Sequence, residues 1–169
     1  MTAPSPIRSV LFDPSRHDSS GFDCGNAQLD RWINHFADHS RRSRTANTYV
    51  FSHESRVIAF YALTPHVTDR DDVDRRVGRG SPDRIPSYLI AKFAVTLTHQ
   101  GRGIGGALLL DALSRLVMAS VDVPSRLIAV EAVDEAAARF YERHGFVRGR
   151  PSSLILHMKT TTAIALISD

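Results

Sequence analysis

The strongest constraint on the fold lies in residues 87–113, where a buried strand, a glycine-rich turn and a helix follow one another. The run SYLIAKFAVT (87–96) is almost continuously apolar, which is typical of a strand covered on both faces. Four glycines then fall within six positions, 101–106, and an apolar helix follows directly. Backbone N–H groups and the positive end of the helix dipole converge at such a turn, so it predicts a phosphate-binding site.

Two common phosphate-binding motifs fit this turn poorly. A P-loop needs Lys and then Ser or Thr after its last glycine, and here Ala and Leu stand in those positions. The dinucleotide fingerprint G-x-G-x-x-G is matched by Gly101, Gly103 and Gly106. In that fold, however, the first glycine directly follows the strand, whereas TLTHQ (96–100) intervenes here. Only about one βα unit remains after residue 120, which also counts against a dinucleotide domain.

Length and composition favour one globular domain spanning residues 1–169. The chain is 43% apolar and 23% charged, which is enough to form a core of its own. A single cysteine, Cys24, allows no internal disulfide and is expected to be a small core residue rather than a nucleophile. The N-terminus has no apolar signal region, and no stretch approaches 18–20 apolar residues. We therefore expect a cytoplasmic protein that does not enter the membrane, and no metal site is predicted.

The first half of the chain predicts a strand, a helix and a hairpin. Residues 9–13 alternate weakly as a strand would, and 21–40 have helical periodicity, with Asp23 or Asn26 as the N-cap. The apolar face of this helix is expected to comprise Leu29, Ile33, Phe36 and Ala37. The β-branched and aromatic runs on either side of Glu54-Ser55 indicate a hairpin.

The second half adds a loop, two helices and two strands. Residues 65–86, with three prolines, are expected to form a long surface loop that can include a short helix. In the helix after the glycines, Leu109, Leu113, Leu116 and Val117 should face inward, and Asp111, Ser114 and Arg115 outward. Residues 125–133 and 153–159 should be strands, with a helix from Asp134 to Gly145 between them. This order predicts α and β elements around one sheet.

The spacing Gln-x-x-Gly-x-Gly at Gln100, Gly103 and Gly105, between a strand and a helix, resembles the signature of the GCN5-related N-acetyltransferases (GNAT). The stretch EAVDEAAARFYERHGF is similar to a helix of that family that carries a tyrosine and ends in Gly-Phe. The resemblance covers nearly the whole chain. It implies an α/β (α+β) fold with one mixed, mostly antiparallel central sheet and flanking helices, and acetyl-CoA as the acetyl donor without a metal.

The resemblance also implies roles for particular residues. The N–H groups of the turn would surround the coenzyme A pyrophosphate, with Arg102 either adding charge or pointing into solvent. The pantetheine arm would pair with the strand near Phe93, and the N–H of Val95 would stabilise the oxyanion. Tyr141 would act as general acid towards the departing thiolate, and no covalent enzyme intermediate is needed. The residues expected to bind the cofactor are Phe93, Val95, Gln100, Gly101, Arg102, Gly103, Ile104, Gly105 and Gly106.

No general base can be selected from the sequence. Glu131 lies at a strand end, and His66, His99 and His144 lie in loops, where a lone histidine is more often incidental. An amine with a pKa near or below 8 would need little help, because much of it is neutral at pH 7 to 8.

Three segments resemble more specifically the GNAT toxins of bacterial type II toxin–antitoxin modules: FDCGNAQLDRWINHFA, residues 88–113, and ARFYERHGF. This resemblance implies that the acetyl acceptor is the α-amino group of aminoacyl-tRNA and that its acetylation blocks translation. It also implies a ribbon-helix-helix antitoxin as partner and a homodimeric toxin.

The distribution of arginine gives modest support for a phosphate-rich substrate, because the chain has 19 arginines and two lysines. The alternatives are codon bias and solvated surface faces. Residues 65–86 hold five Arg and five Asp, so this segment should exert no net attraction on tRNA. The residues expected to bind tRNA are Arg41, Arg42, Arg44, Arg139, Arg143, Arg148 and Arg150.

Two other functions fit the same residues. One is a GNAT that acetylates protein N-termini, lysines or small-molecule amines, and the other is a catalytically idle nucleotide-binding or adaptor domain. The idle domain would bind acetyl-CoA but turn it over poorly.

Overall fold

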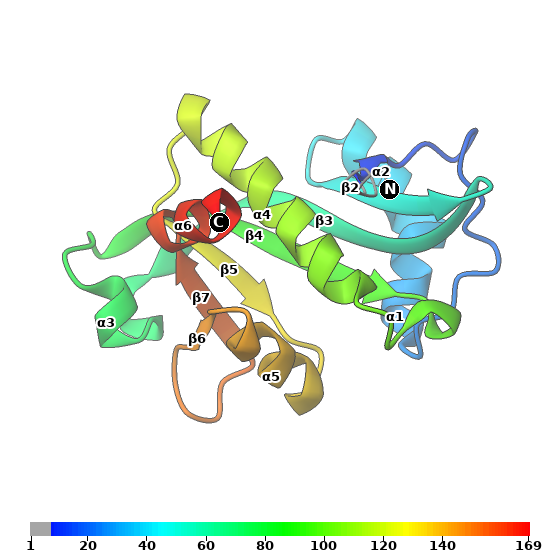
Figure 1. The fold of residues 1–169 in the computed structure, drawn as a ribbon. Coiled ribbons are helices and arrows are strands. Elements are labelled where there is room, and N and C mark those ends of the chain that lie inside the picture. Colours follow the sequence, from blue (N-terminus) through cyan, green and yellow to red (C-terminus); the bar gives the residue numbers. More distant parts are fainter. Residues whose placement is uncertain (1–7) are drawn as a thin grey trace. The chain divides into compact units, whose positions relative to one another are not determined.

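The computed structural model describes residues 8–169. Its strands form one mixed, mostly antiparallel sheet with flanking helices (Figure 1). The strand order is β1-β2-β3-β4-β5-β7-β6, with β4 and β5 parallel. The strands are β1 (Val10–Leu11), β2 (Asn47–His53), β3 (Arg56–Asp69), β4 (Arg84–Val95), β5 (Leu127–Glu131), β6 (Val147–Arg148) and β7 (Ile155–Lys159). The predicted fold class is confirmed.

The helical segments lie mainly where periodicity indicated them. They are α1 (Ala27–Arg31), the π-helical turn η1 (Trp32–Phe36), α2 (Ala37–Arg42), the 3-10 turns η2 (Arg70–Asp72) and η3 (Leu97–His99), α3 (Arg75–Gly78), α4 (Ile104–Asp122), α5 (Glu135–Arg143) and α6 (Thr160–Ser168). The chain forms two compact units, of which the first comprises residues up to Leu63 with Lys92–Ala112. The second comprises Thr64–Ala91 with Leu113–Asp169.

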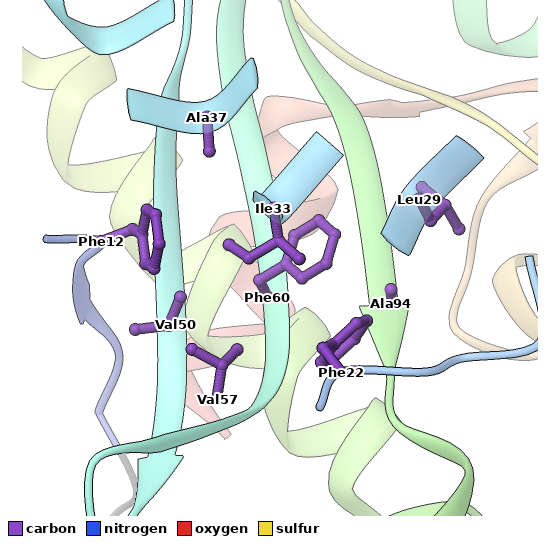
Figure 2. Packing of buried hydrophobic residues seen from close by; sticks show 9 residues of the cluster. All are labelled: Phe12, Phe22, Leu29, Ile33, Ala37, Val50, Val57, Phe60 and Ala94. Carbon is purple, nitrogen blue, oxygen red and sulfur yellow. The ribbon is translucent and has the colours of Figure 1, made fainter. Parts of the chain in front are cut away.

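The core of the first unit lies where α1, η1 and α2 pack on β2, β3 and β4. Figure 2 shows this cluster, in which Ile33 and Phe60 are almost completely buried. Cys24 and Trp32 are partly buried against it, and the Lys92 ammonium lies 5.4 Å from the centre of the Trp32 ring. The cluster consists of Phe12, Phe22, Leu29, Ile33, Ala37, Val50, Val57, Phe60 and Ala94.

The helical stretch after residue 21 differs from the prediction at one apolar position. Asn26 is the N-cap, and its side chain accepts hydrogen bonds from the N–H groups of Gln28 and Leu29. Phe36 was expected on the buried face but is 49% exposed. The reason is the π-helical turn η1, which shifts the helical phase after Trp32 so that Phe36 faces solvent, while Ala37 is buried as predicted.

The hairpin between β2 and β3 turns where the sequence predicted. Glu54 and Ser55 have positive φ angles of 49° and 68°, as a tight hairpin turn requires. The loop predicted for residues 65–86 is mostly regular structure, however. β3 continues to Asp69 and β4 begins at Arg84, because Pro65 and Pro86 lie within strands rather than ending them.

The second unit contains the remaining predicted elements and two that were missed. Asp134 caps α5 by accepting a hydrogen bond from the Ala137 N–H at 2.8 Å, and Gly145 follows the helix with a φ of +99°. The short strand β6 and the C-terminal helix α6 were not predicted. A small core of this unit joins Val73, Val77, Ile85 and Leu127, with Val147 packed against it.

Helix α4 is a longer apolar segment than we expected from the sequence. Among the described residues it alone could span a membrane by length and composition. Leu108, Leu109 and Ala112 are buried, however, and Asp111, expected to face outward, is half-buried. Its carboxylate accepts hydrogen bonds from the Tyr61 hydroxyl at 2.5 Å, from the Ser9 hydroxyl and from the Ser9 N–H at 3.2 Å. These contacts identify α4 as a core helix.

Replacing Asp111 should therefore destabilise the first unit. Asp111→Ala removes the acceptor of two buried hydroxyl groups, and we expect a loss of about 2 kcal/mol in the free energy of unfolding by urea. Asp122→Ala, at the exposed end of the same helix, is the matched control and should change stability little. Equal unfolding midpoints for the two variants would contradict this role for Asp111.

His157 makes the stability of the second unit dependent on pH. Its side chain is 1% exposed, its Nδ1 has no hydrogen-bond partner in residues 8–169, and burial lowers its pKa from 6.5 to about 4. Since the folded state disfavours the protonated ring, the stability present above pH 6.5 is lost as the pH falls towards 4. We expect a loss on the order of 2–3 kcal/mol across that range.

The measurement is urea unfolding at several pH values between 4 and 7. His157→Leu should flatten the part of the profile due to this residue, whereas His53→Leu, at an exposed position, should leave the profile as it is. Parallel profiles for the wild type and His157→Leu would show that His157 does not titrate in this way.

Candidate functional site

The glycine-rich turn, residues 100–106, is held against the end of β4 by a side chain. Gln100 donates from Nε2 to the Val95 carbonyl at 2.8 Å and to the Cys24 carbonyl at 3.3 Å. The preceding η3 turn is fixed by the Leu97 N–H, which donates to the Asp23 carbonyl at 2.8 Å. The glutamine of the predicted signature therefore orders the turn through its carboxamide.

The backbone of this turn presents hydrogen-bond donors that the described part of the chain leaves unused. Ala107 donates the first helical bond, to the Gly103 carbonyl at 3.2 Å. The N–H groups ahead of it, from Gly101 to Gly106, donate to no acceptor within residues 8–169. They stand at the N-terminus of the 19-residue helix α4, where the helix dipole adds positive potential. This arrangement suits an anionic ligand such as a pyrophosphate.

The two glycines that precede α4 leave room for such a ligand. Gly101 and Gly103 have φ angles of +75° and +80°, and no heavy atom lies within 4 Å of the position that a Cβ would take in either. A side chain here would be strained and would occupy the space in front of the donors. Arg102, between them, is exposed and forms no ion pair with any described residue. The residues present fit the pyrophosphate of coenzyme A.

The end of β4 presents a donor on the side away from β3. Thr96 donates its N–H to the Ile58 carbonyl of β3 at 2.9 Å, so the Val95 N–H points the opposite way because donors alternate along a strand. Ala94 faces the core, and Phe93 and Val95 are half-buried on the other face of the strand. A thioester lying along this edge could accept the Val95 hydrogen bond.

Tyr141 lies in the second unit, on α5. Its side chain is 4% exposed and packs edge-on against Phe140 and Phe146, with ring centroids 5.3 and 5.7 Å away. Burial raises the pKa of Tyr141 above its ordinary value of 10. The phenol therefore holds its proton at neutral pH and can act as a donor but not as a base.

One of the arginines expected to bind tRNA has a structural role instead. The Arg148 side chain is 12% exposed and binds both Glu135, at 2.5 Å, and Glu142, at 2.9 Å. These carboxylates raise the pKa of Arg148, and the hydrogen bonds from Arg148 lower the pKa of Glu135. Because this guanidinium joins β6 to α5, we remove Arg148 from the predicted tRNA contacts.

The other six arginines are exposed and paired to different degrees. Arg41 and Arg42 share Asp38, at 3.3 and 3.0 Å. Arg139 and Arg150 make long ion pairs of 3.8 Å, and exposed pairs of this kind are weak and leave the charge accessible. Arg44 and Arg143 form no ion pair within the described residues.

The remaining titratable candidates offer no activated nucleophile. Burial raises the pKa of the Cys24 thiol to about 11, so this cysteine is not a thiolate at neutral pH. His99 and His144 each have Nδ1 occupied, by the Thr98 hydroxyl at 2.9 Å and the Phe140 carbonyl at 2.8 Å. In residues 8–169, no three His, Cys, Asp or Glu side chains come together as a metal site.

The turn at the start of α4 and the Val95 donor at the end of β4 are the two features expected of an N-acetyltransferase. Residues 44–148 match the acetyltransferase (GNAT) domain, and the chain belongs to this family. It is 33% identical over 152 residues to a tRNA-acetylating toxin of Mycobacterium tuberculosis, covering 90% of this chain and 92% of that protein.

Solved structures with the same fold include two of the toxin AtaT. AtaT complexed with acetyl-methionyl-tRNAfMet superimposes with a TM-score of 0.84 at 23% identity, covering 95% of this chain and 98% of that one. A point variant of AtaT bound to the C-terminus of the antitoxin AtaR and acetyl-CoA gives 0.81 at 22% identity, covering 95% and 97%. The predicted GNAT family and fold are confirmed.

The open space at Gly103 can be tested by filling it. Gly103→Ala places a Cβ in front of the turn donors and imposes a strained φ, so we expect acetyl-CoA affinity to fall by about 10-fold or more, measured by calorimetry. Gly21→Ala is the control, since it also adds a methyl group in open space but at an ordinary φ angle. Unchanged affinity in Gly103→Ala would show that the pyrophosphate binds elsewhere.

Proposed function

We propose that this protein is an acetyl-CoA-dependent N-acetyltransferase toxin that acetylates the α-amino group of aminoacyl-tRNA and so blocks translation. The observation that carries the proposal is the similarity to a tRNA-acetylating toxin along nine-tenths of both chains. The donor-bearing turn before α4 supplies the matching chemistry, because it suits the pyrophosphate of the acetyl donor. Residues 1–169 would form one catalytic domain.

In this proposal the first unit binds and polarises the acetyl donor. The N–H groups from Gly101 to Gly106, with Arg102, bind the pyrophosphate, and the pantetheine arm lies along β4 near Phe93. Acetyl-CoA supplies the activated acetyl thioester. The Val95 N–H donates a hydrogen bond to the thioester carbonyl oxygen and stabilises the negative charge that grows when the amine attacks.

Tyr141 would then give its proton to the departing thiolate. An isolated phenol is a weaker acid than a thiol in water, and burial raises the pKa of Tyr141 further. The same water-excluded surroundings also disfavour the thiolate anion, so the proton affinities of the two groups rise together. The proton transfer therefore stays feasible, and a phenol that is fully protonated before reaction is suited to this step.

The tRNA would be held by exposed arginines that bind its phosphates. We propose Arg41, Arg42, Arg44, Arg139, Arg143 and Arg150 for this role, since each is exposed. Further proposals are a homodimer in the cytoplasm and a ribbon-helix-helix antitoxin as the neutralising partner. The AtaT variant solved with the C-terminus of AtaR is the related case that supports a protein antitoxin.

Transfer of labelled acetyl groups to a pool of aminoacyl-tRNAs tests the function directly. We expect label on the α-amino group of the amino acid, with turnover lowered about 100-fold or more in Tyr141→Phe and acetyl-CoA affinity nearly unchanged. Tyr88→Phe is the matched control, because it removes a hydroxyl whose hydrogen bond goes to the Val123 carbonyl at 2.5 Å. This control should retain turnover.

The possible failures have distinct meanings. Label only on proteins or free amines would refute the tRNA substrate while leaving an N-acetyltransferase. Tight acetyl-CoA binding without any transfer would indicate the catalytically idle domain. Full turnover in Tyr141→Phe would remove that residue from the mechanism.

A further inference from the structure

The second unit contains an arginine-lined pocket whose residues have no role in the acetyl transfer or the tRNA contacts proposed above. Its volume is about 610 Å³, and η2 and α3 form most of its wall (Figure 1 labels α3). Arg70, Arg75 and Arg79 line it together with a single acidic residue, Asp71, and the glycines Gly78 and Gly80. A volume of this size admits a nucleotide-sized group rather than only water.

Residues 65–86, which surround the pocket, contain equal numbers of Arg and Asp, but these charges are not evenly distributed around the pocket. Asp83 binds Arg70 at 2.6 Å, Asp74 binds Arg76 at 3.2 Å, and Asp72 lies 3.8 Å from Arg150. These acids lie against arginines other than Arg75 and Arg79. Within the described part of the chain, no carboxylate lies within 4 Å of the Arg75 or Arg79 guanidinium. The pocket therefore carries net positive charge, contrary to the expectation for residues 65–86.

Arg70 and a further arginine, Arg126, fix the backbone around the pocket. Arg70 donates to the Ser81 carbonyl at 2.9 Å. Arg126 donates to the Arg79 carbonyl at 3.2 Å and to the Ser81 hydroxyl at 2.7 Å. Because these bonds hold Arg79 and Ser81 in place, the free guanidinium groups project from a fixed frame. A binding site built in this way loses little conformational entropy when a ligand enters.

The pocket adjoins a segment already proposed to contact tRNA. Arg150 forms its ion pair with Asp72, the neighbour of Asp71. The contact is close, since a Cβ on Gly149 would lie 2.0 Å from the Asp72 carbonyl oxygen, a distance that only glycine permits. Arg150 thus lies beside the segment that carries the pocket.

The lining suits an RNA backbone better than an acidic peptide. Guanidinium groups bind phosphate oxygens with two parallel hydrogen bonds. Asp71 repels carboxylates and phosphates alike, but it can accept a hydrogen bond from a ribose 2′-hydroxyl, which an ionised acidic side chain cannot donate. A phosphodiester backbone that carries 2′-hydroxyl groups satisfies both kinds of side chain.

We propose that the pocket formed by Arg75, Arg79 and Asp71 binds a phosphodiester segment of the tRNA substrate, an inference that rests on the proposed function. The pocket contributes to tRNA affinity and positions the tRNA without taking part in acetyl transfer. Its arginines bind phosphates of the RNA backbone, so their effect is independent of the tRNA sequence.

The test compares tRNA binding and acetylation in the double variant Arg75→Ala/Arg79→Ala with the wild type. We expect tRNA affinity to fall about 10-fold and the slope of log affinity against log salt to become shallower by about one to two units. The KM for aminoacyl-tRNA should rise while kcat at saturation and acetyl-CoA affinity stay unchanged. Arg76→Ala, next in sequence but not among the residues that line the pocket, is the matched control and should behave as wild type.

The outcomes separate the pocket from the function as a whole. Wild-type protein that neither binds nor acetylates tRNA would refute the proposed function. Wild-type acetylation with equal tRNA affinity and salt slope in the double variant would refute the pocket alone. Unchanged tRNA binding together with weaker antitoxin binding would assign the pocket to a protein partner instead. Thermal unfolding confirms that each variant is folded.

Discussion

The hydrogen bond from the Gln100 carboxamide to the Val95 carbonyl is the contact on which the donor site of the first unit depends. It closes the four-residue connection between β4 and the turn, residues 96–99, and so fixes where the chain enters α4. The positive φ angles of Gly101 and Gly103 then direct successive N–H groups outward instead of into helical bonds.

The local conformation of this turn could be predicted from the sequence because its determinants are local. The glycine-rich turn, the Asn26 and Asp134 caps and the Glu54-Ser55 turn each depend on residues within a few positions of one another. Phe36 and Asp111 were predicted on the wrong side for different reasons. The π-helical turn shifts the phase of a short helix, and Asp111 is drawn inward by Tyr61 and Ser9, whose proximity depends on the tertiary fold.

The limit of prediction from local sequence is clearer for the arginines, because whether a guanidinium can bind a ligand depends on which carboxylate it is paired with. Arg148 appeared free in sequence, yet Glu135 and Glu142 bind it. Arg75 and Arg79 appeared neutralised by neighbouring aspartates, yet those aspartates bind other arginines. Which charges pair depends on where their side chains lie in the folded chain, and spacing in the sequence does not give this. Counting the charges in a segment therefore misjudges its electrostatic potential.

The near absence of lysine has a chemical consequence for a protein that handles activated acetyl groups. Only Lys92 and Lys159 offer ε-amines, and the Lys92 ammonium lies over the Trp32 ring. Guanidinium groups stay protonated and do not react with thioesters at neutral pH. A basic surface built from arginine thus resists self-modification and would keep its charge through repeated cycles of catalysis.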